Sequence, residues 1–218
     1  TSTVKNSKIK ISLRNDVPSW KNATLWLTDY DECTWYGIDC DEQGKVSVID
    51  LHNNNLIGFF PDVKDLKETL VYLDLSGNRI LYGSSFQTLS NLEYLDISEN
   101  SYNSLIPDEF MKLSSLTFLN ANNSGLIGDF SFIEGMPLLQ ELWLDNNSNL
   151  NGSIPSSIVE SSMLEILSIS NSGLTGTIPP EIGSLSNLRV IRLVNNTLTS
   201  TIPSSIASMT NLQNFHTD

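Results

Sequence analysis

Apolar residues recur at a fixed spacing from Val46 to the C-terminus. In eight segments, the last of them incomplete, an apolar residue is followed by two others at +3 and +5, and in most segments by Asn at +8. Alternation around +3 and +5 predicts a short strand with one buried face, and its repetition predicts an array of stacked coils whose strands pair in parallel. The segments start 22 to 25 residues apart, at Val46, Leu70, Leu92, Leu116, Leu139, Leu164, Leu188 and Leu212.

The +8 position carries a short polar side chain in seven of these segments. We expect its amide or hydroxyl to satisfy backbone groups where the chain leaves the strand and turns. The residues are Asn54, Asn78, Asn100, Ser124, Asn147, Ser172 and Asn196.

A second motif follows the turn and is clearest in LNGSIPSSI (150–158), LTGTIPPEI (174–182) and LTSTIPSSI (198–206). Glycine permits a tight backbone path, and proline lacks the donor that a central strand or a regular helix needs. The back of the array is therefore predicted to consist of short extended and 3₁₀ segments. The second and fourth segments, with GSSFQTLSN (83–91) and IGDFSFIEGMP (127–137), depart from the motif and predict irregular coils.

Together these motifs read LxxLxLxxNxLxGxIPxxI, which resembles the plant-type extracellular leucine-rich repeat over roughly four-fifths of the chain. Trp26 and the segment 31–51, with Cys-x₆-Cys and Trp-x-Gly, resemble the N-terminal cap of the same family, in a form similar to that of algal proteins such as those of diatoms. The resemblance implies an α/β solenoid, wound as a right-handed superhelix with a parallel β-ladder on its concave face and a helical N-terminal cap. We expect residues 1–45 to form an arm and the cap, and residues 46–218 to form seven full repeats and the start of an eighth.

Cys33 and Cys40 are the only cysteines, too few for a zinc site without other ligands. The resemblance implies that they form a disulfide, which indicates an oxidising compartment. The alternative is a pair of reduced, buried thiols in a cytosolic protein.

The N-terminal region combines basic and apolar residues. Residues 1–21 hold five basic residues and Asp16, which gives this segment a net charge of +4. Because the whole chain has a net charge of −13, the remaining residues carry −17. Either a basic arm docks on the acidic cap segment 29–42, or the lysines are merely solvated. Apolar residues between Ile9 and Leu27 predict a short helix that covers the first coil.

The net charge of −13 argues against binding to nucleic acid or an anionic lipid surface. No run of about eighteen apolar residues predicts insertion into a membrane. Five Asn-x-Ser/Thr sequons predict N-glycosylation and a secreted or cell-surface protein, although chance competes where the repeat already places Asn beside the turn. They are Asn22, Asn122, Asn146, Asn151 and Asn195.

Catalytic groups are sparse. His52 and His216, the only histidines, lie seven coils apart in the predicted array, and no nucleophile, phosphate-loop or metalloprotease motif is present. We therefore expect no enzyme, no cofactor and no metal site.

The exposed face of the ladder is left to carry the function. Its +2 and +4 columns predict an aromatic stripe beside an acidic one, which would receive a protein, a peptide or a glycan. Aspartates on strands about 4.8 Å apart repel each other unless water, a cation or a basic partner intervenes. The alternative is that these are default residues of the repeat that support turns and solubility. The candidate binding residues are Tyr72, Asp74, Tyr94, Asp96, Phe118, Asn120 and Trp143.

Sugars at the sequons near this face, Asn122, Asn146 and Asn195, would move a large protein ligand to the convex side or a lateral edge.

The eighth segment stops without a C-terminal cap, and we expect further repeats or a membrane anchor, a stacking partner, or a frayed edge. A structural subunit of a larger assembly is the alternative function. Ice binding ranks last because the +4 column is too mixed.

Overall fold

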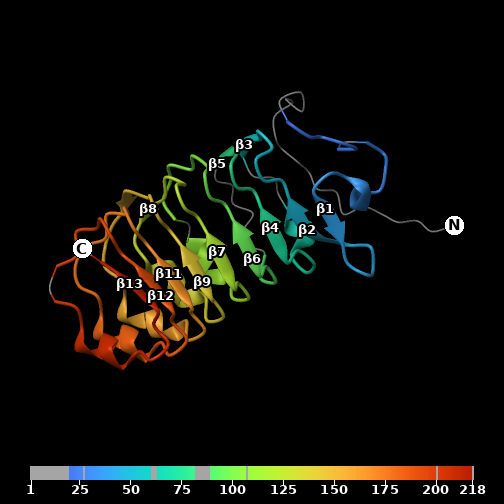
Figure 1. The fold of residues 1–218 in the computed structure, drawn as a ribbon. Coiled ribbons are helices and arrows are strands. Elements are labelled where there is room, and N and C mark those ends of the chain that lie inside the picture. Colours follow the sequence, from blue (N-terminus) through green and yellow to red (C-terminus); the bar gives the residue numbers. More distant parts are fainter. Residues whose placement is uncertain are drawn as a thin grey trace.

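The computed structural model describes residues 20–26, 28–59, 63–81, 89–106, 108–199 and 201–217. These residues form an elongated array of stacked coils, with the strand β1 near one end and β13 at the other (Figure 1). Each coil contributes one short strand to a common sheet.

This sheet has nine strands. β1 (Ile38–Cys40) pairs antiparallel with β2 (Val46–Asp50), and every later pair is parallel. The later strands follow in chain order as β4 (Tyr72–Asp74), β6 (Tyr94–Asp96), β7 (Phe118–Asn120), β9 (Glu141–Trp143), β11 (Ile166–Ser168), β12 (Val190–Arg192) and β13 (Asn214–His216). The predicted parallel ladder is thereby confirmed.

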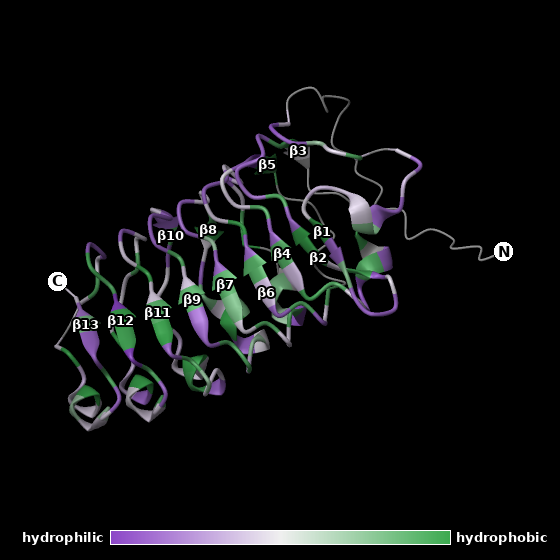
Figure 2. Cartoon of the chain, turned by 45° about the vertical axis from the view of Figure 1, so that its right-hand side comes forward, coloured by the Kyte–Doolittle hydropathy of each residue, from purple (hydrophilic) through white to green (hydrophobic). Residues whose placement is uncertain are grey.

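From β4 to β12, the middle residue of each strand of this sheet points into the core. Leu73, Leu95, Leu119, Leu142 and Leu167 have no exposed surface. Because the strands pair in register, each leucine packs beside its counterpart in the next coil, and the hydrophobic effect acts between coils. Hydrophobic segments recur from coil to coil along the whole array (Figure 2).

The back of the array consists of 3₁₀ turns, as predicted. They are η3 (Lys64–Leu66), η5 (Asp108–Lys112), η6 (Ser131–Gly135), η7 (Ser156–Glu160), η8 (Pro180–Ser184) and η9 (Ser204–Ser208). Two further two-stranded parallel sheets form, β3 (Ile57–Phe59) with β5 (Arg79–Leu81), and β8 (Ile127–Gly128) with β10 (Asn149–Leu150).

The irregular coil predicted for the fourth segment is wrong. Ser131–Gly135 forms a 3₁₀ turn like those of the proline-containing coils, and the buried Phe130, Phe132 and Ile133 fill its interior. Apolar filling therefore substitutes here for the proline motif. The corresponding part of the second segment lies mostly outside the described residues.

The +8 side chains bond backbone groups at the turn, as predicted, and they also join neighbouring coils. Asn78 donates through Nδ2 to the carbonyls of Leu51, at 2.8 Å, and Leu75, at 2.9 Å, and its Oδ1 accepts the backbone N–H groups of Asn54 and Leu56. One amide thus satisfies backbone groups of two coils. Side chain to backbone bonds of the same kind are made by Asn100, Ser124, Asn147, Ser172 and Asn196.

The residue before this column, at +7, adopts a left-handed backbone conformation in all seven coils. A positive φ favours Gly and Asn, which explains why the repeat keeps them at this turn. At Gly77, with φ +64°, an added Cβ would lie 2.2 Å from the side-chain oxygen of Asn53 in the preceding coil. The other residues of the column are Asn53, Glu99, Asn123, Asn146, Asn171 and Asn195.

The cap covers the first coil with indole rings. Trp26 and Trp35 are buried with ring centres 5.0 Å apart, and Trp20 packs edge-on against Trp26 at 5.1 Å. Residues 20–26 form turns rather than a helix, and most of the predicted helix between Ile9 and Leu27 lies outside the described residues, as does the basic arm before residue 20. The helical cap is therefore not confirmed.

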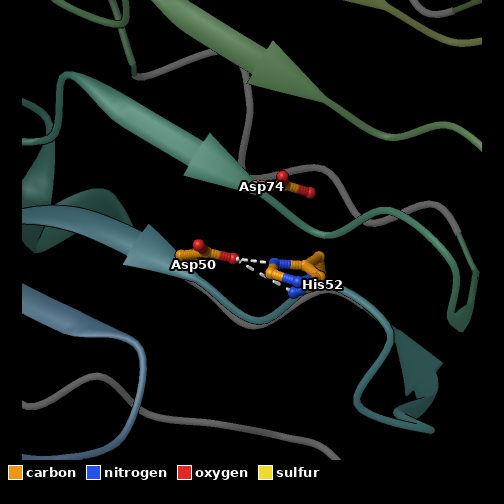
Figure 3. Close-up of side chains that lie close together, drawn as sticks. All are labelled: Asp50, His52 and Asp74. Carbon is orange, nitrogen blue, oxygen red and sulfur yellow. Dashed lines mark hydrogen bonds and ion pairs between the residues drawn. The ribbon is translucent and has the colours of Figure 1, made fainter.

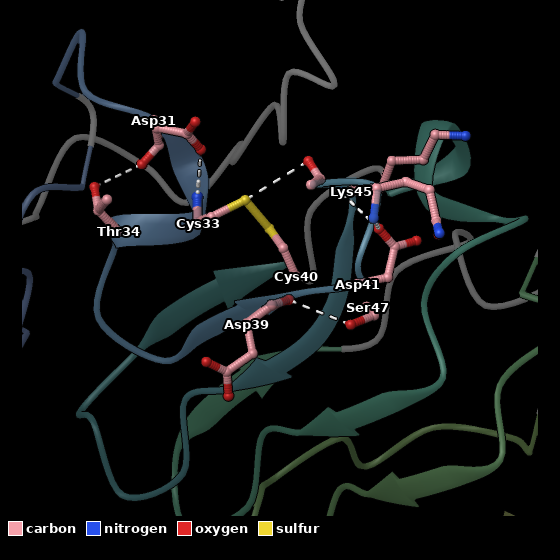
Figure 4. The surroundings of a disulfide bond; sticks show 10 residues. Asp31, Cys33, Thr34, Asp39, Cys40, Asp41, Lys45 and Ser47 are labelled. Atoms are coloured by element: carbon pink, nitrogen blue, oxygen red, sulfur yellow. Dashed lines mark hydrogen bonds between the residues drawn. A yellow bond between two sulfur atoms is a disulfide. The ribbon is translucent and has the colours of Figure 1, made fainter.

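A disulfide joins Cys33 to Cys40, as the family resemblance implied (Figure 4). Cys33 belongs to the short 3₁₀ turn η2 (Glu32–Thr34), and Asp31 caps this turn by accepting the backbone N–H of Cys33. Cys40 ends β1, so the bond ties the cap to the first strand of the sheet.

Candidate functional site

The outward side of the nine-stranded sheet carries the +2 and +4 side chains, and we call it the ladder face. Its +2 column contains the predicted aromatic stripe. Tyr72 and Tyr94 stack with ring centres 4.2 Å apart and an interplanar angle of 8°, and Tyr94 and Phe118 stack at 4.3 Å and 3°. The three rings are partly buried and partly exposed.

Burial raises the pKa of both tyrosines above the ordinary value, most strongly for Tyr94. Both phenols are therefore neutral across the physiological range. A neutral phenol can donate as well as accept a hydrogen bond, so the stack offers polar groups at the rim of an apolar surface.

The +4 column is in the predicted register, with Asp50, Asp74 and Asp96 on adjacent strands. The expected exposure is wrong for two of them, because Asp74 is only 9% exposed and Asp96 only 8%. In each case a serine two residues later folds over the carboxylate. Ser76 donates its backbone N–H and its hydroxyl to Oδ1 of Asp74 at 2.9 and 2.7 Å, and Ser98 does the same for Asp96 at 2.9 and 2.6 Å.

Asp96 uses its second oxygen as well, since Oδ2 accepts the side-chain amide of Asn120 at 2.9 Å. These bonds favour the turn-supporting interpretation for Asp96 and Asn120. A binding role for these two residues stays a prediction.

A polar and aromatic cluster follows the stripe. The indole N–H of Trp143 donates to Oε2 of Glu141 at 2.9 Å, and the guanidinium carbon of Arg192 lies 5.4 Å from the centre of the indole ring. This distance is within the range of a cation–π contact. Ser168, the intervening +4 residue, is small and fully buried, so Arg192 reaches across one coil to Trp143.

Reading the sequence one residue at a time did not identify Glu141 and Arg192 as site residues. The signal was present, because Trp143 and Arg192 occupy the same column two coils apart.

At the N-terminal end of the ladder face, His52 bonds to Asp50, with 2.6 Å between Nδ1 and Oδ1 (Figure 3). This hydrogen bond, with the negative charge of Asp50, raises the pKa of His52. Burial raises the pKa of Asp74, and the bonds from Ser76 partly oppose that effect. His52 stands in the first coil and His216 in β13, so within the described residues the two histidines do not meet.

The sequons differ in accessibility. Asn146, Asn151 and Asn195 are exposed, and Asn22 and Asn122 are partly buried. The side-chain oxygen of Asn122 accepts the backbone N–H of Asp145, and Nδ2 of Asn195 donates to Asn171 at 2.9 Å. Glycosylation at each site stays a prediction.

Within the part of the chain that the structure describes, no helix has the length and apolar character that crossing a bilayer requires.

Comparison with known proteins places these features in a family. Leucine-rich repeat models match residues 69–90, 81–126, 163–185 and 187–209. The tomato (Solanum lycopersicum) Receptor-like protein EIX1 is 32% identical over 152 residues, which cover 60% of this chain and 15% of that protein. The Arabidopsis thaliana Serine/threonine-protein kinase BRI1-like 1 is 34% identical over 161 residues, covering 71% of this chain and 13% of the relative. The chain thus spans less than a sixth of the length of either.

Solved structures give the same result. The complex of PEPR1 with AtPEP1 superimposes with a TM-score of 0.82 at 29% identity and covers 92% of this chain and 30% of the compared one. The Arabidopsis receptor kinase HAESA, in complex with the peptide hormone IDA and the co-receptor SERK1, gives a TM-score of 0.69 at 26% identity, over 87% and 37% of the two chains. This chain is a leucine-rich repeat protein, and its relatives are plant receptor-like proteins and receptor ectodomains.

Proposed function

We propose that this chain is a non-enzymatic recognition module that binds a protein or peptide ligand on the ladder face. The observation that carries the proposal is the continuous run of accessible aromatic and charged groups, from the stack begun by Tyr72 to the contact between Trp143 and Arg192. Aromatic and arginine side chains dominate the energetics of protein interfaces. The solved relatives PEPR1 and HAESA were crystallised with AtPEP1 and with the peptide hormone IDA, respectively.

The charges on this face give a ligand a direction. Asp50 and Asp74 lie at the β2 and β4 end, and Arg192 lies at the β12 end. A peptide with a basic group toward β2 and an acidic group toward β12 would match the ladder at both ends.

The spacing of the strands sets the reach of such a peptide. Parallel strands lie about 4.8 Å apart, so the three pairings from Phe118 to Val190, the strand of Arg192, span about 14 Å. An extended peptide rises about 3.3 Å per residue and covers that distance with roughly four residues. An apolar side chain over the stack and a carboxylate at Arg192 therefore fit within one short segment.

The disulfide between Cys33 and Cys40 supports an oxidising compartment, and we place the module on the secreted or outer cell-surface side. Its structural relatives are receptor ectodomains, in agreement with this placement. A glycan partner is expected from the sequence alone and is not part of this proposal.

The test selects ligands from a displayed library of random peptides against the immobilised, disulfide-bonded protein. Enriched peptides are then measured by calorimetry against Tyr94→Ala, Trp143→Ala and Arg192→Ala. We expect at least a tenfold loss of affinity for each variant, since truncating a hot-spot residue costs about 2 kcal/mol or more and about 1.4 kcal/mol corresponds to a factor of ten. Tyr30→Ala is the control, because Tyr30 is an aromatic residue 67% exposed outside the ladder face. If the three ladder-face variants bind the peptides as tightly as the parent protein and the control do, or if no peptide is enriched, the ladder face is not the binding surface.

Glycan mapping by mass spectrometry separates this surface from others. Full occupancy at Asn122, Asn146 and Asn195 would place sugars on or beside the ladder face, and a large protein ligand would then bind at the convex side or a lateral edge. Empty sites would leave the face open.

A further inference from the structure

Three potential metal ligands converge at the N-terminal end of the ladder face. Asp50 and Asp74 end neighbouring strands, and His52 follows Asp50 by two residues. One ligand atom from each lies within 4.8 Å of the other two. Figure 3 shows the three side chains together beside the ends of β2 and β4.

Asp74 is the fixed member of this group. Its side chain is nine-tenths covered, and both donors of Ser76 hold Oδ1. Among the described residues no group donates to its Oδ2. A fully buried oxygen without a donor would count among the unsatisfied buried atoms, and Oδ2 does not, so it remains in contact with solvent. The Asp74 carboxylate is thus held in place beside Asp50 and His52, and one of its two oxygens has no protein donor among the described residues.

Asp50 and His52 are the adjustable members. Their side chains are 38% and 49% exposed and are joined by the 2.6 Å contact between Oδ1 and Nδ1. A zinc ion binds carboxylate oxygen and imidazole nitrogen at about 2.0–2.2 Å, so two ligand atoms of a tetrahedral site lie about 3.4 Å apart. Around an ion, Asp50 and His52 would therefore open their 2.6 Å contact and move closer to Asp74, which their exposure permits.

The surrounding charge favours a cation. Asp50, Asp74 and Asp96 stand in register on adjacent strands, where unscreened carboxylates repel each other. Asp96 has both oxygens engaged, by Ser98 and Asn120, and contributes charge rather than a ligand atom. In the described part of the chain no lysine or arginine forms an ion pair with Asp50 or Asp74.

We propose that Asp50, His52 and Asp74 form a binding site for a divalent metal ion of the zinc type, with water in the remaining positions. The ligand set selects the class of ion. Imidazole suits zinc and its transition-metal neighbours, whereas calcium takes six to eight oxygen ligands, which this site does not supply. The ion takes the place of the proton between Asp50 and His52, and this proton leaves to solvent. The site does not depend on the proposed peptide recognition, and an ion bound there would compete with a basic group of the peptide for Asp50 and Asp74.

Calorimetry tests the site on the full chain, with zinc chloride or calcium chloride titrated into protein in chelator-free buffer at neutral pH. We expect one zinc ion per chain and no comparable heat from calcium. His52→Gln and Asp74→Asn should each weaken zinc binding at least tenfold. The Asp74→Asn amide keeps an oxygen for Ser76 but places a nitrogen, which cannot bind the ion, in the other position.

His216→Gln is the matched control, because His216 is an exposed histidine at the other end of the array, in the +4 column that contains Asp50 and Asp74. It should leave the affinity for zinc unchanged, and zinc should shift the imidazole NMR signals of His52 but not those of His216. No binding at about 1 mM zinc, which corresponds to a free energy weaker than roughly −4 kcal/mol, would overturn the proposal. Equal zinc affinity in His52→Gln and the parent protein would also overturn it, and because His52 is exposed this comparison remains valid if Asp74→Asn fails to fold.

Discussion

Replacing Asn147 by alanine tests whether the +8 side chains hold the coils together. The side chain of Asn147 is fully buried. It donates to the carbonyls of Ala121 and Leu144 at 2.8 and 2.9 Å, and it accepts the backbone N–H groups of Ser124 and Leu126 at 3.2 and 3.0 Å. Alanine removes these bonds and takes the side-chain partner away from the buried carbonyl of Ala121 and the N–H groups of Ser124 and Leu126. The carbonyl of Leu144 still accepts the hydroxyl of Ser172.

The magnitude follows from the three groups that lose their partner. A buried polar group without a partner costs about 1–3 kcal/mol, and water admitted to the small cavity would satisfy some of them. We therefore expect the free energy of unfolding to fall by about 4 kcal/mol, a large part of the roughly 5–15 kcal/mol typical of a domain. Asn147→Ser should lose about half as much, since Ser172 makes the equivalent bond to the carbonyl of Leu144 through its hydroxyl, at 2.7 Å.

Equilibrium denaturation in urea, followed by circular dichroism, measures both variants. Asn187→Ala is the control, because Asn187 is exposed and makes one side-chain bond, to the carbonyl of Ser162. That change should stay within about 0.5 kcal/mol of the parent. A loss below about 1 kcal/mol for Asn147→Ala, or serine performing no better than alanine, would refute the reasoning.

Three further predictions concern the cap, a turn and a carboxylate. Replacing Cys33 and Cys40 by serine should lower the free energy of unfolding by about 2–3 kcal/mol, as expected for opening so short a loop, and a thermal melt in the presence and absence of reductant measures it. Gly77→Ala should destabilise by about 2 kcal/mol in a urea titration, because alanine at positive φ is strained and its Cβ would collide with the preceding coil. The backbone N–H and hydroxyl of Ser131 lower the pKa of Asp129, so their stabilising effect is full above the ordinary aspartate pKa and is lost as the pH falls through the lowered value; in an NMR titration Ser131→Ala should raise the midpoint of Asp129.

The register of the ladder was predictable because the repeat fixes it. When parallel coils of nearly equal length stack, residues at the same offset must lie side by side, and so Tyr72, Tyr94 and Phe118 stack as their spacing indicates. The role of the +8 Asn followed from the same offset. These features depend on backbone geometry that each coil repeats.

The environment of individual side chains was harder to predict. Asp74 and Asp96 occupy outward positions, yet Ser76 and Ser98 cover them, and only the recurring Asp-x-Ser spacing signalled it. His52 lies at +6 rather than +4, so reading straight columns did not bring it to Asp50. Such contacts depend on local turns and rotamers, which the period of the repeat does not encode.

Because the coils stack in register, the length of the binding surface is proportional to the number of coils. Each coil contacts only the coils beside it, so one whole additional repeat inserted between β7 and β9 would replace the contacts between these two coils by equivalent ones, leave all other contacts unchanged, and move Trp143 about 4.8 Å farther from Phe118. Gain or loss of a whole repeat would therefore change the length of ligand that the ladder face can span, in discrete steps, while the packing of the interior stays the same.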